Sequence, residues 1–348
     1  LFLFALDNTD FTMGSISAAN AEFCFDVFRE LKVHHANDNI FYSPLSIISA
    51  LAMVYLGARG NTQSQMEKVL HFDNITGVGD TNDSQCGTSE YLHNSFKNLL
   101  SDITTPNATY SLKIAERLYI EKTYPILPEY LKCAKKFYKA GLEEVNFKTA
   151  TEEARQLVNS WVEKETNGQI QDLLVSGSVD FDTALALVNA IYFKGIWKTA
   201  FKEEDTQEMP FNVTELEKKI SFEKLTEWTS PNVMEKRRVK VYLPRMKIQE
   251  KYNLTSILTA LGMTDLFSPS ANLSGISSAE NLKISEAIHE AYMEVNEEGT
   301  EMAGSAGVMG DIKHSSELEE FRADHPFLFF IKHNPTNSIL FFGKYCSP

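Results

Sequence analysis

Apolar residues recur at helical spacing through much of the first half of the chain. The segment 15–33 repeats them behind a serine that can cap a helix. The segment 44–60 has a proline at its start and a glycine at its end, which is the usual asymmetry of a helix. Between the helical patterns, the stretch 73–89 is rich in Gly, Asp, Asn, Thr and Ser and predicts a surface loop. The same spacing predicts further helices at 62–72, 128–141, 151–170 and 253–263.

Strand patterns begin at 110–122, where apolar and polar residues alternate, and they dominate the last third of the chain. The nearly continuous apolar run 183–197 predicts a central strand covered on both faces. Segments 239–248 and 283–295 predict further strands, and 327–345 predicts a hairpin that turns at 334–337. No repeat or long linker divides the chain. We therefore expect one α+β domain over 15–348, with residues 1–14 as an N-terminal extension.

The composition is that of a chain that can bury a large core, since 43% of its 348 residues are hydrophobic. Its net charge of -14 argues against nucleic-acid binding. Four lysines nevertheless cluster at helical spacing, so a site for a polyanion such as heparin stays open beside the simpler interpretation of a solvated face. No run of eighteen apolar residues is present, so no membrane span is predicted. The lysines are Lys132, Lys135, Lys136 and Lys139.

No motif for catalysis or for metal or nucleotide binding occurs in the chain. Its four cysteines lack zinc-ligand spacing, His289 has the pattern of a core histidine, and Glu297–Glu298 resemble the paired acids of turns. We therefore expect no enzyme, no cofactor and no metal. Several Asn-x-Ser/Thr sequons are compatible with glycosylation on the secretory route, and the expected acceptors are Asn74, Asn82, Asn107, Asn253 and Asn272.

The stretch 293–321 has no large aromatic residue before Phe321, although apolar runs flank it on both sides. Long structureless segments of this kind are uncommon in compact domains unless they have a function. In order and spacing, five segments resemble the signature segments of the serpin family: 39–66, 159–170, 187–197, 295–301 and 323–345. The likeness covers the chain from Ser15 to its end. Segments 14–35, 126–138 and 320–330 are closest to the ovalbumin branch of that family.

The resemblance implies a serpin fold, with a helical N-terminal half, a large central sheet and an exposed reactive-centre loop. In inhibitory members this loop baits a protease, is cut and then inserts into the main sheet as a strand. By the family's counting from the hinge glycine, the bait bond is Lys313–His314, and a lysine there suits a trypsin-like serine protease. The hinge residues are Gly299, Thr300, Glu301, Met302 and Ala303.

Strand periodicity tests whether this loop can insert. One alternating set, from Thr300 to Gly310, carries no charge and can face a core. However, Gly304, Gly307 and Gly310 interrupt the segment, and each glycine costs about 0.5–1 kcal/mol in an ordered strand relative to alanine. With the ovalbumin-branch likeness, this favours a non-inhibitory or weakly inhibitory protein of egg white, with a role in storage or defence. An active inhibitor of trypsin-like proteases remains the alternative.

The resemblance also assigns residues outside the loop. Ser43, Ser46, Asn189 and His289 match the polar "shutter" cluster beneath the main sheet, and Trp197 matches the tryptophan where insertion begins. Cys86 and Cys133 match a bridged pair, which would leave Cys24 and Cys346 free. Secreted members of this branch lack a cleaved signal peptide, so we expect a secreted monomer without one.

The chain departs from the family pattern near 214–215. There, "EMPFNVT" passes directly to "ELEKKISFEKLTEW", whereas serpins carry about fifty more residues, enough for four strands with their turns. The smaller sheets are therefore expected to be truncated, and the final hairpin should lose cover. Exposure of each large apolar side chain would forfeit about 1.5–3 kcal/mol, so the chain should be less stable and prone to aggregate. The residues concerned are Phe327, Phe329, Phe330, Ile331, Ile339, Leu340, Phe341 and Phe342.

Overall fold

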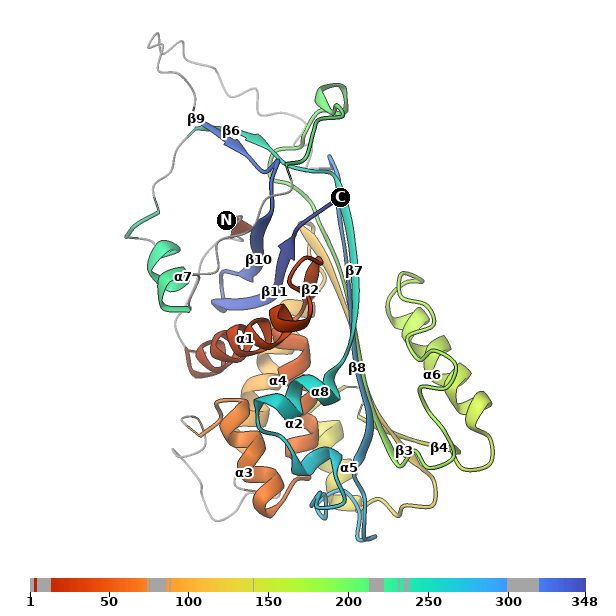
Figure 1. Ribbon diagram of the computed structural model, residues 1–348. Coiled ribbons are helices and arrows are strands. Elements are labelled where there is room, and N and C mark those ends of the chain that lie inside the picture. The colour runs from red at the N-terminus through yellow and green to blue at the C-terminus, as the bar shows by residue number, and fades with distance from the viewer. Residues whose placement is uncertain are drawn as a thin grey trace.

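A five-stranded sheet runs through the centre of the fold in the computed structural model, as Figure 1 shows. Its order is β4-β3-β5-β8-β7. The structure describes residues 3–4, 14–73, 75, 86–87, 89–139, 141–212, 222–230, 232–234, 238–298 and 319–348. The strands of this sheet are β3 (Tyr110–Glu121), β4 (Leu142–Val145), β5 (Leu185–Gly195), β7 (Met246–Asn253) and β8 (Ile284–Val295).

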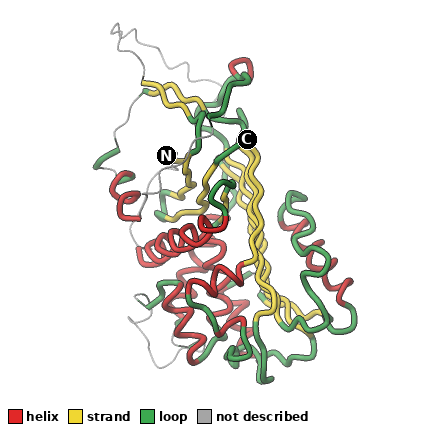
Figure 2. Tube along the Cα trace, in the orientation of Figure 1, coloured by secondary structure: helices red, strands yellow, loops and turns green. Residues whose placement is uncertain are grey.

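The central strand β5 is covered on both faces, as its continuous apolar run predicts. Leu185, Leu187 and Phe193 belong to the larger core cluster, whereas Ala186 and Val188 belong to a second cluster on the other face. Helix α6 (Thr151–Glu165) covers that second face, and most other helices lie on the first, as Figures 1 and 2 show. The sheet therefore separates two apolar layers.

The helices on the first side of the sheet come mostly from the N-terminal half. They are α1 (Gly14–His34), α2 (Pro44–Tyr55), α3 (Gly60–Val69), α4 (Glu90–Thr104), α5 (Pro128–Phe137), α7 (Phe222–Trp228) and α8 (Leu254–Leu261), with the short 3-10 turn η2 (Asp265–Phe267). A second 3-10 turn, η1 (Glu203–Asp205), lies beyond the end of the sheet, at the top of Figure 1.

The prediction of one helix over 44–60 is wrong in its extent. Helix α2 ends at Tyr55, and α3 begins at Gly60, whose φ of 57° lies in the left-handed region that favours glycine. Gly57 lies between them against Ile276, where a Cβ would stand 2.2 Å from Cγ1. Helix α4 was not predicted, although Leu92, Phe96, Leu99 and Ile103 follow a helical period and are buried.

A four-stranded sheet of order β1-β10-β11-β2 packs beside the first. It combines β1 (Leu3–Phe4) and β2 (Ile40–Tyr42) with the hairpin of β10 (Phe327–His333) and β11 (Ser338–Tyr345). A separate pair joins β6 (Val239–Tyr242) to β9 (Glu319–Arg322). The predicted strand 239–248 is therefore two strands, β6 and β7, in different sheets, with Pro244 between them.

The prediction that the final hairpin loses cover is wrong for all eight residues named above, because each is buried. On one face, Phe25 and Phe28 of α1 contact Phe342, with ring centroids 5.6 and 4.9 Å away. On the other, Phe341 lies 5.6 Å from Phe193 of the central sheet. Helix α1 and the five-stranded sheet thus enclose the hairpin from both sides.

Candidate functional site

A buried polar cluster joins helix α2 to the two middle strands of the five-stranded sheet. Asn189 of β5 and His289 of β8 are register partners, and His289 Nδ1 lies 2.5 Å from Asn189 Oδ1. The Ser46 hydroxyl donates to the same Asn189 oxygen at 2.8 Å, and the Asn189 amide donates back to the Ser46 carbonyl at 3.2 Å. Ser43 caps α2 through its hydroxyl, which accepts from Ser46 N. The structure thus brings together the four residues of the predicted shutter.

The hydrogen bonds of His289 define its tautomer. The Ser43 backbone N–H donates to His289 Nε2 at 3.1 Å, so this nitrogen is the acceptor. The proton therefore resides on Nδ1, which donates to Asn189 Oδ1. Complete burial lowers the pKa of His289 to about 3, because no water stabilises the imidazolium. His289 is therefore neutral, and its two ring nitrogens hydrogen-bond β8 to β5 and to the start of α2.

One member of this cluster was not found from the sequence. Glu116 of β3 is buried and accepts from the Ser49 hydroxyl at 2.6 Å, and it lies opposite Asn189 in the β3–β5 register. Burial raises the pKa of Glu116 to about 7, and the Ser49 bond offsets only part of this effect. The signal that could have located it is the alternation of β3, which places Glu116 on the same face as the core residues Leu112, Leu118 and Ile120.

A second cluster anchors residues 296–298 at the end of the sheet, immediately before 299. The Trp197 indole N–H donates to the Asn296 carbonyl at 2.8 Å, and the Trp197 backbone N–H donates to the Glu298 carbonyl at 3.1 Å. Phe201 N donates to the Glu297 carbonyl, and the Phe201 ring packs edge-on against Trp197 at 5.3 Å. Trp197 therefore holds the backbone that leads into the predicted loop.

The two acids of this segment also have defined partners. Glu298 forms an ion pair with Lys194 at 2.7 Å. Glu297 accepts from the Thr206 hydroxyl at 2.8 Å and lies 3.7 Å from Arg245, and the Thr206 bond lowers its pKa. Glu297 lies at a bend, in line with the interpretation of the two acids as turn residues, and both side chains also contact residues distant in sequence.

Strands β5 and β8 are direct neighbours and run parallel. Their register extends from Leu185 opposite Ile284 to Phe193 opposite Met293. A strand running antiparallel to both would fit between them if they separated, and antiparallel pairing is slightly more stable per residue than parallel pairing. The same separation would break the His289–Asn189 bond, because its two residues lie on opposite sides of the seam.

The predicted loop residues Gly299, Thr300, Glu301, Met302, Ala303, Lys313 and His314 lie outside the described residues, as do Asn74, Asn82 and the 214–215 junction. The other sequons are exposed at Asn107, Asn253 and Asn272. The Asn253 side chain caps α8, and its amide nitrogen donates to Glu286 at 3.2 Å.

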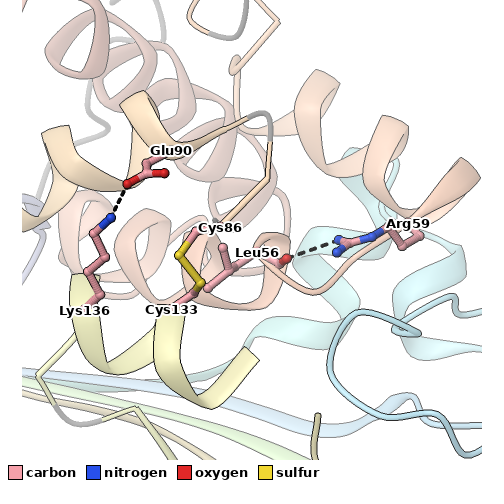
Figure 3. The surroundings of a disulfide bond; sticks show 6 residues. All are labelled: Leu56, Arg59, Cys86, Glu90, Cys133 and Lys136. Atoms are coloured by element: carbon pink, nitrogen blue, oxygen red, sulfur yellow. Dashed lines mark hydrogen bonds and ion pairs between the residues drawn. A yellow bond between two sulfur atoms is a disulfide. The ribbon is translucent and has the colours of Figure 1, made fainter. Parts of the chain in front are cut away.

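The structure forms the disulfide between Cys86 and Cys133, which ties the segment before α4 to α5, as Figure 3 shows. Beside it, Lys136 of α5 pairs with Glu90 of α4. Cys24 and Cys346 are free thiols, both buried. The other three lysines of the predicted cluster are exposed, at Lys132, Lys135 and Lys139.

Two features are absent from the part of the chain that the structure describes. None of the helices in that part has the length and apolar content needed to cross a bilayer. No group of three or more His, Cys, Asp and Glu side chains within it is arranged to hold a metal ion.

Comparison with known proteins identifies the fold. The family model "Serpin (serine protease inhibitor)" matches residues 18–215 and 212–348. The chain belongs to the serpin family. It is 63% identical to ovalbumin-related protein Y of Gallus gallus, over 97% of this chain and 100% of that protein. It is an ovalbumin-like serpin.

Two solved structures of ovalbumin match the fold of this chain. A crystal structure of uncleaved ovalbumin matches with a TM-score of 0.86 and 53% identity, over 96% of this chain and 100% of that one. The loop-inserted structure of a cleaved ovalbumin mutant matches with a TM-score of 0.83 and 51% identity, over the same shares. The chain is therefore similar in fold both to uncleaved ovalbumin and to the cleaved, loop-inserted ovalbumin mutant.

The comparisons also show a difference in length. The alignment with protein Y runs over 388 residues, whereas this chain has 348. The relative therefore carries residues that this serpin lacks. The serpin family model matches in two parts that meet at 212–215.

Proposed function

We propose that this chain is a secreted ovalbumin-like serpin of egg white that acts in storage or defence and inhibits proteases weakly or not at all. Its reactive-centre loop lies within Met293–Phe321, and Lys313–His314 is the bond that a trypsin-like protease would cut. The chain has no catalytic role of its own. Its secretion is supported by its likeness to the ovalbumin branch and by its exposed sequons.

One observation carries this proposal. Strands β5 and β8 pair directly with each other, and the segment that would have to insert between them is rich in glycine. Insertion must break the Asn189–His289 bond and the parallel ladder along β5. The entering strand would include Gly304, Gly307 and Gly310, which together weaken it by about 2–3 kcal/mol relative to alanine. A weaker driving force slows insertion, which an inhibitor must complete before the acyl-enzyme is hydrolysed.

Incubation with trypsin tests this function. We expect cleavage after Lys313 and no complex that survives denaturing electrophoresis. The matched control is Lys313→Gln, which should resist cleavage at this bond while keeping the same melting temperature. A covalent complex of chain and protease at a stoichiometry near one would overturn the proposal and establish the inhibitory alternative.

Polyanion binding is a second candidate, supported by the exposed lysines on and beside α5. Retention on a heparin column, with elution that depends on salt, would support it. Lys132→Gln/Lys135→Gln should then elute at lower salt, whereas a control pair of lysines on two other helices, Lys164→Gln of α6 and Lys224→Gln of α7, should not change the elution. Elution of the native chain at the salt concentration of a non-binding protein of equal charge would exclude this candidate.

A further inference from the structure

His71 follows helix α3 at a position where glycine is usual. The Phe72 N–H donates to the Glu67 carbonyl at 2.8 Å. The His71 N–H donates to the Lys68 carbonyl at 3.4 Å, and the two bonds together are the Schellman pattern of helix C-termini. The residue at His71 then has a left-handed backbone, and its φ is 56°. Glycine or asparagine is commonest at this position, whereas here the turn carries an imidazole.

The imidazole of His71 lies between two carboxylates of α1. Its Nε2 is 2.7 Å from Asp26 Oδ2, and its Nδ1 is 3.0 Å from Glu22 Oε2. Glu22 and Asp26 are four residues apart and therefore lie on the same face of the helix. Arg29, one turn further along, pairs with the other oxygen of Asp26 at 2.9 Å. His71 thus joins the end of α3 to α1.

This arrangement suits a ring with two N–H donors. A neutral imidazole has one N–H, so its other nitrogen would direct a lone pair at a carboxylate. The imidazolium has an N–H at each nitrogen and can face both carboxylates favourably. Two further features favour the charged form. The like charges of Glu22 and Asp26 repel each other on the helix face, and the C-terminal end of α3 attracts a cation.

The charged groups that face His71 come from two elements. Glu22 and Asp26 belong to α1, and Asp73 belongs to the turn after α3. The hydrogen bond with Asp26 is the largest influence, and it raises the pKa of His71 above its usual 6.5, against the opposing effect of partial burial. The contribution of His71 to stability is therefore complete below pH 6.5 and is lost as the pH rises through the folded-state value.

We propose that His71 is a proton-dependent clasp between α3 and α1. When the imidazole is charged, it attracts both Glu22 and Asp26 and fixes the end of α3 to α1. When it is neutral, one of the two carboxylate contacts becomes repulsive and the clasp loosens. The effect reaches beyond these two helices, because α1 also covers the final hairpin with two phenylalanine rings.

Histidine ring C–H signals in NMR spectra test the charged form directly. The His71 signal, assigned by its loss in His71→Asn, should titrate above pH 6.5 in the native chain. Asp26→Asn and Glu22→Gln should each lower its midpoint by at least about half a pH unit, because each removes one carboxylate. A midpoint that stays unchanged in either variant would overturn the clasp.

Variants at position 71 test the consequence for stability. His71→Asn suits the left-handed backbone and removes the titrating ring, whereas His71→Arg stays positively charged across the range. Between pH 5.5 and pH 9, the melting temperature of the native chain relative to His71→Asn should fall by at least about 2 °C. The melting temperature of His71→Arg relative to His71→Asn should not fall. A constant difference for the native chain, or an equal fall for the arginine variant, would refute the proposal.

His34→Asn is the matched control for these measurements. His34 is an exposed histidine of α1 that lies 3.8 Å from a single carboxylate, Glu30. Its replacement should change the melting temperature by the same amount at both pH values, within about 1 °C. A fall as large as that expected for His71 would mean that surface histidines in general cause the effect, and the clasp would be refuted.

Discussion

Asn189 and His289 face each other across the parallel strands β5 and β8, and the His289 Nδ1–H is hydrogen-bonded to Asn189 Oδ1 at 2.5 Å. The same oxygen accepts from the Ser46 hydroxyl. A single side-chain amide therefore connects two strands and a helix at the seam where a further strand would have to enter. Its partners are buried and have no access to water, so the loss of this amide should affect all of them.

Replacement of Asn189 by alanine leaves the Ser46 hydroxyl and the His289 N–H without their acceptor. Each unsatisfied buried group costs about 1–3 kcal/mol, so we expect the free energy of unfolding to fall by about 2–6 kcal/mol. Urea unfolding at pH 7 measures this loss. Asn232→Ala, at an exposed position, is the control and should cost less than about 0.5 kcal/mol. An equal loss in both variants would contradict the assigned network.

The folded state should lose stability in acid through His289. Because burial lowers its pKa from 6.5 to about 3, the folded state binds fewer protons than the unfolded state between these values. The contribution of His289 is complete above pH 6.5 and declines as the pH falls towards 3. We expect His289→Gln to show a shallower loss of unfolding free energy between pH 6.5 and 4 than the native chain. Parallel curves would show that His289 does not titrate in this range.

Glu116 should act in the opposite direction. Its pKa is raised from 4.5 to about 7, so the folded state binds more protons and stability declines as the pH rises from 4.5 to 7. Glu116→Gln keeps an acceptor for Ser49 and removes the buried charge. We expect it to be about 2–4 kcal/mol more stable than the native chain at pH 8 and nearly equal at pH 4.5. A gain of the same size at both pH values would rule out titration as the cause.

The disulfide between Cys86 and Cys133 closes a loop with a sequence separation of 47. Under the chain-entropy description, its loss should lower the free energy of unfolding by about 3–4 kcal/mol. Cys86→Ser/Cys133→Ser should therefore melt earlier than the native chain. A reductant should lower the melting temperature of the native chain and leave that of the double variant unchanged. An equal response of both to reductant would mean that a disulfide other than Cys86–Cys133 is responsible.

Restoration of strand propensity in the loop should promote insertion after cleavage. Gly304→Ala/Gly307→Ala/Gly310→Ala removes a cost of about 2–3 kcal/mol from the inserted strand. After a cut at Lys313–His314, we expect the triple variant to gain more thermal stability than the cleaved native chain. The uncut forms of both proteins serve as controls and should melt alike. No difference between the cleaved forms would show that the glycines do not limit insertion.

Local patterns in the sequence were sufficient for much of this fold. The continuous apolar run of β5 and the amphipathic helix α6 both lie where their spacing predicts them, although α6 ends at Glu165 and the prediction ran to 170. Helix α4 carried the same kind of signal in Leu92, Phe96, Leu99 and Ile103, and it was overlooked beside the polar stretch before it. The family likeness correctly grouped Asn189 and His289, which no local pattern relates.

The features that the sequence did not predict depend on contacts between distant segments. Glu116 has a partner in the core only because Ser49 of α2 packs against β3, and Glu297 is fixed only because Arg245 and Thr206 approach it from elsewhere. The cover of the final hairpin was predicted wrongly because the expectation counted the missing strands alone. Phe25 and Phe28 of α1, on the helix that follows the N-terminal extension, supply part of that cover.

The anchoring of Asn296 and Glu298 by Trp197 has a consequence for a molecule that has been nicked. A cut anywhere in 299–318 leaves an N-terminal fragment that contains this anchor and a C-terminal fragment that contains β9 and the buried hairpin of β10 and β11. The two fragments should stay associated, because strands of the C-terminal fragment pair with strands of the N-terminal fragment: β11 with β2, and β9 with β6. A nicked molecule should therefore travel as one particle in native solution and separate into two bands only when it is denatured.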